Sequence, residues 1–477
     1  MILDNIKKKW DKMSVAKKAS LALIFAKFCQ KGIAMVSTPI FTRIMATDQF
    51  GAITNFTSWQ SIIVIVATLN LSQGVFNNGM LEFKNDRNRF TFSALALANA
   101  CTVAFFCVYA IFRGQLHKYI GLSDQLMTLM FAYMIFYPAF SYWSCRQRYE
   151  YKYKLLTVIT ILTTLLQMVF GVLAVLSVRT QNQALAKLYA TEIVLIVTGI
   201  MMYIVIAIRA RFKVKLSYVK YAFQFNIFLV PHFLAMTVLA SGDKVMIASM
   251  VGNTETAIYG VSYTAASVIN IFWQAIEASW TPWLFEHLNS NNRNPIKNRA
   301  NQIITVFATI SMACMLFAPE IMRILASKSY MEGIYIIPSV TAGVFFTAVY
   351  ALYMRLEYFS KKTKATMIGS AVVAVANVIM NYVFIKLFGY MAAGYTTLAC
   401  YIFLSMYHYW YSRKIGMRDI YDDKYIIALS IGMIAFSIIV TFTYSYSFLR
   451  YGLIILVGAI CFWMRNWIIL QIKNILK

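Results

Sequence analysis

Fourteen apolar stretches, each about 20 residues long, follow one another along this 477-residue chain. A helix needs about 20 mostly apolar residues to cross the hydrocarbon core of a bilayer. Charged residues make up only 13% of the sequence, about half of their share in soluble globular proteins. These features exclude a soluble enzyme, a disulfide-stapled secreted domain and a disordered chain. They predict an all-α polytopic membrane protein with about 14 transmembrane helices.

The breaks between the apolar stretches are short, and the longest covers about residues 278–300. No soluble domain fits into such a loop, and the sequence contains no phosphate-binding loop or other familiar catalytic motif. We therefore expect neither ATP hydrolysis nor a cofactor. The predicted spans lie near residues 18–42, 52–76, 91–112, 125–145, 155–177, 185–208, 221–241, 256–277, 301–325, 333–354, 366–387, 391–411, 425–444 and 450–471.

The chain carries 44 Lys and Arg residues against 18 Asp and Glu residues, a formal net charge of +26. Basic nucleic-acid-binding proteins do not contain this much continuous apolar sequence, so a nucleic-acid partner is not expected. Of the cations, 31 fall in the alternate breaks that include the N-terminus, and only eight fall in the other breaks. Lys and Arg favour the cytoplasmic side. The pattern predicts a multi-pass protein of the cytoplasmic membrane with both termini in the cytoplasm.

Two of the remaining cations lie on one face of the first predicted helix. Lys27 and Lys31 are four residues apart, with Gln30 beside them. A Lys at the bilayer centre costs about 2.5–3.5 kcal/mol on insertion scales, so the pair favours a polar cavity. For Lys27, extension of the side chain to the inner interface is an equally good interpretation.

Three carboxylates fall inside or at the ends of predicted spans: Glu192, Glu277 and Glu357. Such groups bind a coupling H⁺ or Na⁺ in a transporter and pair with a neighbouring cation in a static protein, and the sequence favours neither interpretation. The Cys and His residues show no spacing typical of a metal site, so no metal is expected.

A short repeat suggests two related halves. Residues 47–51 (TDQFG) follow the first span and residues 254–260 (TETAIYG) follow the seventh, and in both a Thr and an acid precede a Gly. Six crossings restore the same orientation, so this spacing suggests two parallel six-helix lobes with an additional helix pair.

Several motifs resemble those of the Wzx-type polysaccharide flippases, which belong to one superfamily with the MATE drug exporters and the lipid II flippases. Residues 38–45 (TPIFTRIM) resemble the first-helix signature. Further agreement lies in residues 241–247 (SGDKVMI), 280–286 (WTPWLFE) and 388–397 (FGYMAAGYTT), with Asn377 and Asn381 before the last. The resemblance covers most of the chain in order.

The resemblance implies a MATE-like fold with an N-terminal lobe over residues 1–210, a C-terminal lobe over 211–412 and an additional helix pair over 413–477. It also implies alternating access and export of a lipid-diphosphate-linked oligosaccharide repeat unit. The carrier is a polyprenyl lipid, and membrane lipids, a polysaccharide polymerase and glycosyltransferases are expected partners. Lys27, Lys31 and Arg43 suit binding of a diphosphate. Asp243 and Lys244 are expected to form a structural pair.

Three alternatives stay open from the sequence. A lipid II flippase is the nearest competitor, because it belongs to the same superfamily. A MATE-type cation or drug exporter would need a cavity dominated by carboxylates, against which the surplus of Lys and Arg argues. A membrane-embedded glycosyltransferase or polymerase would need a large outer loop, and no outer loop of the predicted topology is long enough.

Overall fold

The computed structural model describes residues 13–290 and 293–463, and in this part of the chain every regular element is a helix. The chain divides into two compact units, Met1–Thr237 (unit 1) and Val238–Lys477 (unit 2), with the boundary inside α11. The predicted all-α class is confirmed. The three-part division at residues 210 and 412 stays a prediction.

Unit 1 contains α2 (Val15–Ile44), α3 (Thr47–Ala67), α4 (Val75–Glu82), η1 (Lys84–Asp86), α5 (Arg87–Ile111), α6 (Arg113–Ile120), α7 (Asp124–Tyr149), α8 (Tyr153–Leu176), η2 (Thr180–Asn182), α9 (Gln183–Arg209), α10 (Leu216–Asn226) and the first part of α11 (Val230–Met250). Unit 2 continues with α12 (Asn253–Ser267), α13 (Asn270–Asn289), α14 (Asn294–Leu316), α15 (Ala318–Leu325), η3 (Lys328–Tyr335), α16 (Ile337–Phe359), α17 (Thr363–Phe388), α18 (Ala392–Lys414), α19 (Asp423–Thr443) and α20 (Ser447–Trp463).

Ten helices of the described chain are long and apolar enough to cross a membrane, and each overlaps a predicted span. The other four predicted spans fall on α2, on α12 with α13, on α18 and on α20. The end of the last predicted span, beyond residue 463, lies outside the described residues. The chain is therefore a multi-pass membrane protein, as its apolar stretches predict.

Several predicted spans are not single helices: the span at 256–277 is divided between α12 and α13, the span at 301–325 between α14 and α15, and two others are interrupted as follows. The span predicted at 52–76 follows α3 to Ala67 and then enters an irregular loop, residues 68–74, before α4 begins. In this loop Leu69 (φ 52°) and Asn70 (φ 45°) adopt left-handed backbone conformations. The span predicted at 221–241 is divided between α10 and α11. Apolar composition predicts membrane burial, but it does not reveal where the backbone leaves the helix.

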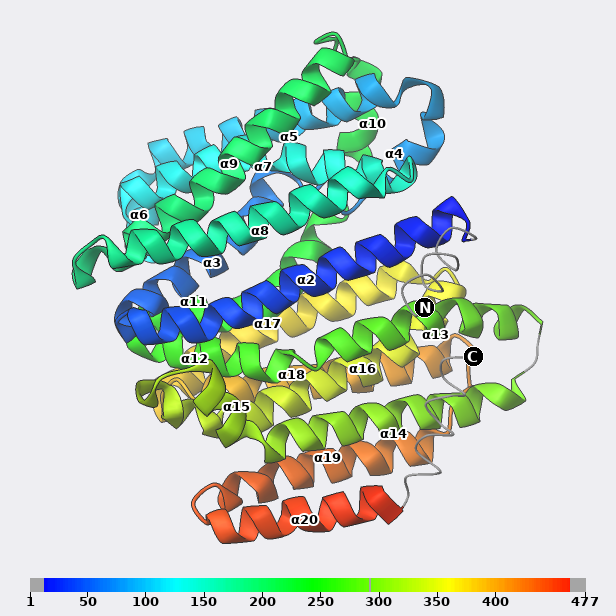
Figure 1. The fold of residues 1–477 in the computed structure, drawn as a ribbon. Coiled ribbons are helices and arrows are strands. Elements are labelled where there is room, and N and C mark those ends of the chain that lie inside the picture. Colours follow the sequence, from blue (N-terminus) through cyan, green and yellow to red (C-terminus); the bar gives the residue numbers. More distant parts are fainter. Residues whose placement is uncertain (1–12, 291–292, 464–477) are drawn as a thin grey trace, which may run out of the picture. The chain divides into compact units, whose positions relative to one another are not determined.

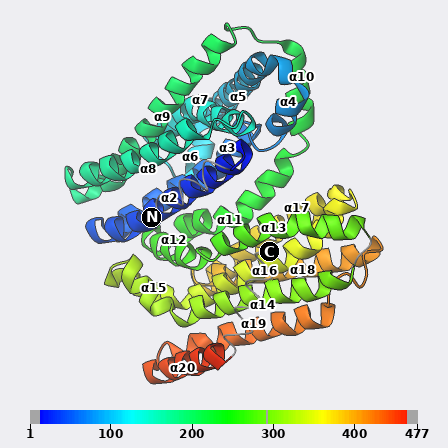
Figure 2. The ribbon, with the colours of Figure 1, turned by 45° about the vertical axis from the view of Figure 1, so that its right-hand side comes forward.

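Helices α5, α7, α8 and α9 run side by side in unit 1 (Figures 1 and 2). An aromatic cluster joins α4, α5 and α7, with ring centroids 5.7 Å apart for Phe76 and Phe90 and 4.8 Å apart for Phe76 and Tyr142. Helix α10 packs against the same end of unit 1, where Tyr218 donates a hydrogen bond to Asp86 over 3.0 Å and Tyr221 donates one to Glu82 over 2.6 Å.

Helix α16 is the central helix of unit 2. In its most apolar window 83% of the residues are buried, against 44% or less for the other nine candidate spans. Helices α12, α14, α18 and α19 pack around it, and Figure 1 shows them running nearly parallel to it. Interior positions of α16 therefore contact protein on all sides.

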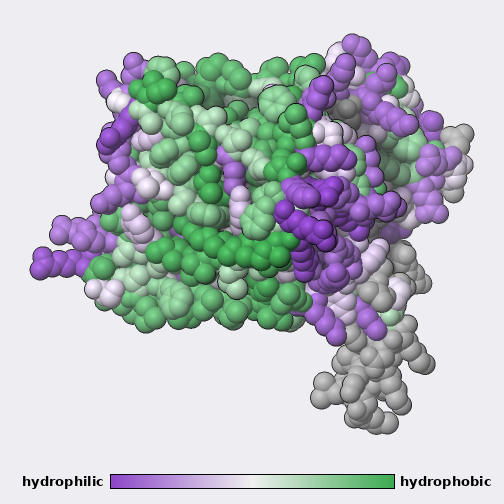
Figure 3. Space-filling view, turned by 90° about the horizontal axis from the view of Figure 1, so that it is seen from above, coloured by the Kyte–Doolittle hydropathy of each residue, from purple (hydrophilic) through white to green (hydrophobic). Residues whose placement is uncertain are grey.

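The surface has the polarity that a bilayer requires. Figure 3 shows a broad hydrophobic band across one face, with hydrophilic residues gathered on both sides of it. On α8 and α9, for example, Leu162, Leu173, Ile193 and Met201 are exposed. Exposed apolar side chains at this density mark a membrane-facing surface.

Candidate functional site

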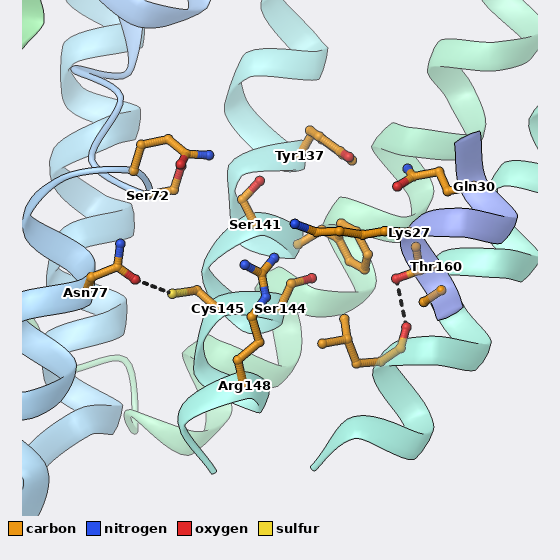
Figure 4. Close-up of a pocket in the computed structure, with 14 residues that line it drawn as sticks. Lys27, Gln30, Ser72, Asn77, Tyr137, Ser141, Ser144, Cys145, Arg148 and Thr160 are labelled. Carbon is orange, nitrogen blue, oxygen red and sulfur yellow. Dashed lines mark hydrogen bonds between the residues drawn. The ribbon is translucent and has the colours of Figure 1, made fainter. Parts of the chain in front are cut away.

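A polar cavity of about 340 Å³ lies within unit 1, where side chains from α2, α7 and α8 point toward one another (Figure 4). The loop at residues 68–74 and the helix α4 complete the wall. Irregular backbone at membrane depth is tolerated where it is buried or lines a cavity, and this loop fits that rule. The lining residues are Ala26, Lys27, Gln30, Ser72, Gln73, Asn77, Tyr137, Phe140, Ser141, Ser144, Cys145, Arg148, Leu156 and Thr160.

Two cations enter this cavity from different helices. Lys27 projects from α2 and Arg148 from the last turn of α7 (Figure 4). None of the lining residues is acidic, and no described residue forms a salt bridge with either cation. Arg presents a planar set of N–H donors that matches phosphate oxygens, and Lys adds a point charge. The cavity is therefore suited to a phosphate-bearing anion.

Uncharged polar groups surround the two cations. Ser141, Ser144 and Arg148 follow one another at helical spacing on α7, so they share one face. The Ser144 side chain is only 5% exposed, and its Oγ has no hydrogen-bond partner in the part of the chain that the structure describes. Asn77 Oδ1 accepts a hydrogen bond from Cys145 Sγ over 3.1 Å. A ligand with hydroxyl groups or phosphate oxygens would satisfy such groups.

A buried Asn fixes the loop that forms one wall. The Oδ1 atom of Asn226 accepts a hydrogen bond from the Val75 backbone N–H over 2.9 Å, and its Nδ2 donates to the Leu69 carbonyl. Asn226 is fully buried. A Cβ on Gly74 would overlap Asn226 Oδ1, so the close approach requires glycine at this position. Asn226 thus positions Ser72 beside the cavity.

The structure brings only one of the three predicted substrate-binding cations to this cavity. Lys31 is exposed on α2 and is not among the lining residues. Arg43 is exposed at the end of the same helix, and its Nη1 donates a hydrogen bond to the Pro39 carbonyl over 2.8 Å. A substrate-binding role for Lys31 and Arg43 stays a prediction.

The three predicted coupling carboxylates have different surroundings. Glu192 is buried on α9 and accepts a hydrogen bond from Gln60 Nε2 over 3.1 Å. Glu277 on α13 accepts one from Arg355 Nε on α16 over 3.1 Å and forms an ion pair with the same guanidinium. Glu357 is fully buried and contacts a histidine, described below.

Asp243 lies in a hydrogen-bond network that spans four helices of unit 2. Its carboxylate accepts hydrogen bonds from Tyr259 over 2.6 Å, Asn381 over 2.6 Å and Thr397 over 2.7 Å. These residues belong to α11, α12, α17 and α18. The neighbouring Lys244 instead places its Nζ 4.2 Å from the centre of the Tyr263 ring. Asp243 and Lys244 thus contact different partners, and the structural role predicted for the pair stays a prediction.

The sequence interpretation missed Arg148, which it assigned to a loop at the inner end of a span. The spacing Ser141–Ser144–Arg148 was a signal, because it places three polar residues on one face of an apolar helix. No group of three or more His, Cys, Asp or Glu side chains arranged for a metal ion occurs among the described residues.

The sequence profile of the family described as "Polysaccharide biosynthesis protein" matches residues 16–288, more than half of the chain. No curated protein matches the chain. Among solved structures, the lipid II flippase MurJ in an inward closed conformation gives a TM-score of 0.65 at 12% identity, covering 94% of this chain and 99% of MurJ.

An inward-facing MATE-family multidrug resistance transporter of the MOP superfamily gives a TM-score of 0.63 at 14% identity, covering 81% of this chain and 95% of its own. A MOP-superfamily transporter from Pyrococcus furiosus gives a TM-score of 0.52 at 13% identity, covering 84% of this chain and 96% of its own. These likenesses show a shared fold. Together with the profile match, they show that the chain belongs to the polysaccharide biosynthesis protein family and has the fold of the MurJ and MATE transporters, which are not enzymes.

Proposed function

We propose that this protein moves a polyprenyl-diphosphate-linked oligosaccharide repeat unit from the inner to the outer leaflet of the cytoplasmic membrane, by alternating access, for surface polysaccharide synthesis. The observation that carries the proposal is the cavity of unit 1, into which Lys27 and Arg148 project without an acidic lining residue. The family match to polysaccharide biosynthesis supplies the class of cargo.

The chemistry of the cavity fits the head group of such a lipid. Lys27 and Arg148 supply positive charge for the diphosphate. Gln30, Gln73 and Asn77 supply neutral amide groups, which are suited to sugar hydroxyls. An exporter of organic cations needs the opposite polarity in its cavity.

The membrane potential supports export of this cargo. A diphosphate carries about two negative charges, and each charge that crosses 100 mV changes its free energy by about 2.3 kcal/mol. Complete crossing from a negative interior therefore releases about 4.6 kcal/mol per 100 mV. Transport in this direction needs no ATP, and coupling to H⁺ or Na⁺ would add to the driving force.

The proposal is tested in proteoliposomes that contain the purified protein and a fluorescent polyprenyl-diphosphate disaccharide. A membrane-impermeant quencher measures how fast the probe appears in the outer leaflet. The wild type should accelerate the movement, and Lys27→Ala and Arg148→Ala should each slow it. Lys213→Ala, which removes an exposed cation away from the cavity, is the matched control.

Two further probes distinguish the alternatives. Faster movement of lipid II than of the disaccharide lipid would assign the protein to peptidoglycan precursor transport. Transport of ethidium without movement of either lipid would contradict the proposal and favour a cation exporter. The proposed orientation has both termini in the cytoplasm. A cysteine placed at either terminus should then be protected from a membrane-impermeant thiol reagent when intact cells are labelled.

The product of this transport would be a lipid-linked repeat unit on the outer leaflet. A polysaccharide polymerase would then consume it, and cytoplasmic glycosyltransferases would supply the substrate. Both are proposed partners, and co-purification of tagged protein with these enzymes tests whether they associate physically.

A further inference from the structure

A buried acid–histidine pair joins three helices of unit 2. The Nδ1 atom of His408 on α18 lies 2.6 Å from Oε1 of Glu357 on α16. Thr366 on α17 donates a hydrogen bond to the other oxygen of the same carboxylate over 2.8 Å. Both side chains of the pair are 0% exposed. Figure 1 shows the three helices adjacent to one another.

The second ring nitrogen of His408 is unusual. Nε2 is buried and has no hydrogen-bond partner within the described residues. Neutral imidazole that donates from Nδ1 leaves Nε2 as an unused acceptor, and imidazolium leaves it as an unused donor. Neither protonation state satisfies every atom, so hydrogen bonding alone does not select one state of His408 over the other.

We propose that the Glu357–His408 pair is a proton-binding site through which unit 2 couples transport to the proton gradient. The inference rests on the proposed transport function and adds the site of proton binding. Carboxylate and neutral imidazole together carry one negative charge, and one added proton makes the pair electrically neutral. A net charge buried inside the protein is costly, so loss of the proton requires access to water.

Burial makes the proton exchange depend on conformation. In this structure neither member of the pair contacts solvent. The proton can therefore enter or leave only when α16, α17 and α18 move apart on one side. Alternating access exposes a site first to one side of the membrane and then to the other. A proton bound in one state and released in the other is thereby linked to the movement of substrate.

Charged groups on the helices around the pair have other partners, and Lys361, Lys362 and Lys364, between Glu357 and Thr366 in the sequence, are exposed. Arg355, on the same helix as Glu357, pairs with Glu277 of α13. Asp423 of α19 accepts hydrogen bonds from Arg413 and Tyr353. No described hydrogen bond or ion pair brings a charged group of α12, α14 or η3 to Glu357 or His408.

Tyrosine side chains complete the surroundings of the pair. The Tyr350 ring of α16 stacks on His408 with centroids 5.8 Å apart. From α18, the Tyr407 ring packs edge-on against His408 at 5.3 Å, and its hydroxyl donates to the Ala365 carbonyl of α17. Tyr358 follows Glu357 directly on α16. These groups stay neutral at physiological pH, so a proton changes only the charge of the pair.

Histidine distinguishes this pair from the other buried carboxylate. Histidine is the side chain that proteins most often use to carry a proton. Glu192 has only the amide of Gln60 as its described hydrogen-bond partner. Its described hydrogen bond therefore brings it no imidazole with which to share a proton.

The test measures the steady-state ratio of a fluorescent polyprenyl-diphosphate disaccharide between the two leaflets of proteoliposomes. For one coupled proton, a gradient of one pH unit shifts this ratio up to about tenfold in the wild type. Glu357→Gln and His408→Gln should abolish the shift and retain movement without a gradient. Glu286→Gln, at an exposed position of the same unit, should keep the full shift.

Thr366→Val is the milder variant if the two others fail to fold. It removes one hydrogen bond from the carboxylate, and we expect it to displace the pH at which the gradient response is half-maximal. A wild-type shift in Glu357→Gln would overturn the proposal. Loss of the shift in Glu192→Gln alone would assign the proton to unit 1 and would equally overturn it.

A second measurement is independent of the substrate. The thermal unfolding midpoint of purified wild-type protein should change between pH 5 and pH 8, and the change should be absent in His408→Gln. If the wild type moves no probe but shows this difference, the proposed cargo is wrong and the proton site stands. If the unfolding midpoints of wild type and His408→Gln depend on pH in the same way, the proton site is overturned.

Discussion

Lys27 and Arg148 reach one cavity from two helices, α2 and α7, that are far apart in the sequence. Lys27 is a cation inside the first predicted span, whereas Arg148 belongs to the cations that the sequence assigns to topology. Their convergence makes unit 1 suited to a diphosphate. We therefore expect each of the two residues to contribute to substrate binding.

Removal of either cation should weaken substrate binding. Hydrogen bonds to charged groups contribute about 1.5–3 kcal/mol each, so Lys27→Ala and Arg148→Ala should each raise the probe concentration for half-maximal flipping roughly 10- to 100-fold. Arg148→Lys should recover part of the loss, because it keeps the charge without the planar donors. A concentration series in proteoliposomes measures the effect, and unchanged curves for both Ala variants would exclude this cavity as the binding site.

The loop between α3 and α4 should depend on Asn226. Asn226→Ala leaves the Val75 N–H and the Leu69 carbonyl without their partner, and each buried unsatisfied group costs about 1–3 kcal/mol. For the two groups together we expect a loss of about 2–6 kcal/mol in stability, together with slower flipping. Thermal unfolding in detergent checks the first effect. Asn289→Ala, at an exposed position, should be neutral, and equal midpoints for the two variants would contradict this account.

Glu150 should make stability depend on pH at the end of α7. Burial by itself raises the pKa of the Glu150 carboxyl, but hydrogen bonds from Lys152 over 2.7 Å and Arg146 over 2.5 Å outweigh it and hold the pKa below the ordinary 4.5. Because the folded pKa is lowered, the stabilisation is present above about pH 4.5 and is lost as the pH falls through the folded value.

Glu150→Gln should therefore unfold at a lower temperature than the wild type at pH 7, by an amount equivalent to about 1 kcal/mol. The two midpoints should converge as the pH falls below about 4.5. Glu286→Gln, which changes an exposed carboxyl, should follow the wild type over the whole range. A constant difference between wild type and Glu150→Gln at all pH values would show that the ion pairs are not responsible.

Asp243 should be the more important member of the predicted Asp243–Lys244 pair. Asp243→Asn replaces one acceptor oxygen by an amide nitrogen, which cannot accept hydrogen bonds from Tyr259, Asn381 or Thr397. We expect a loss of about 2–3 kcal/mol in the stability of unit 2. Lys244→Met should cost less, because Met retains most of the packing against Tyr263. Urea or thermal unfolding of both variants measures which of the two substitutions costs more stability.

The sequence by itself determined that the chain crosses the membrane as a helical protein, because apolar stretches of bilayer length leave no other fold. It also pointed to Lys27, because a cation within an apolar helix is conspicuous. The sequence did not predict the helix breaks at residues 68–74 and between α10 and α11. These breaks depend on local contacts such as those of Asn226, and mean hydropathy over a whole span does not detect them.

Only the tertiary structure decided which polar groups meet. Arg148 is indistinguishable from its basic neighbours in the sequence, but its position on α7 directs it to the same cavity as Lys27. Glu277 and Glu357 are equivalent as acids within or beside spans, yet one meets Arg355 and the other meets His408. Such partners come from helices that are distant in the chain, so helix packing determines which side chains meet. Composition and periodicity describe each helix separately and therefore do not predict these contacts.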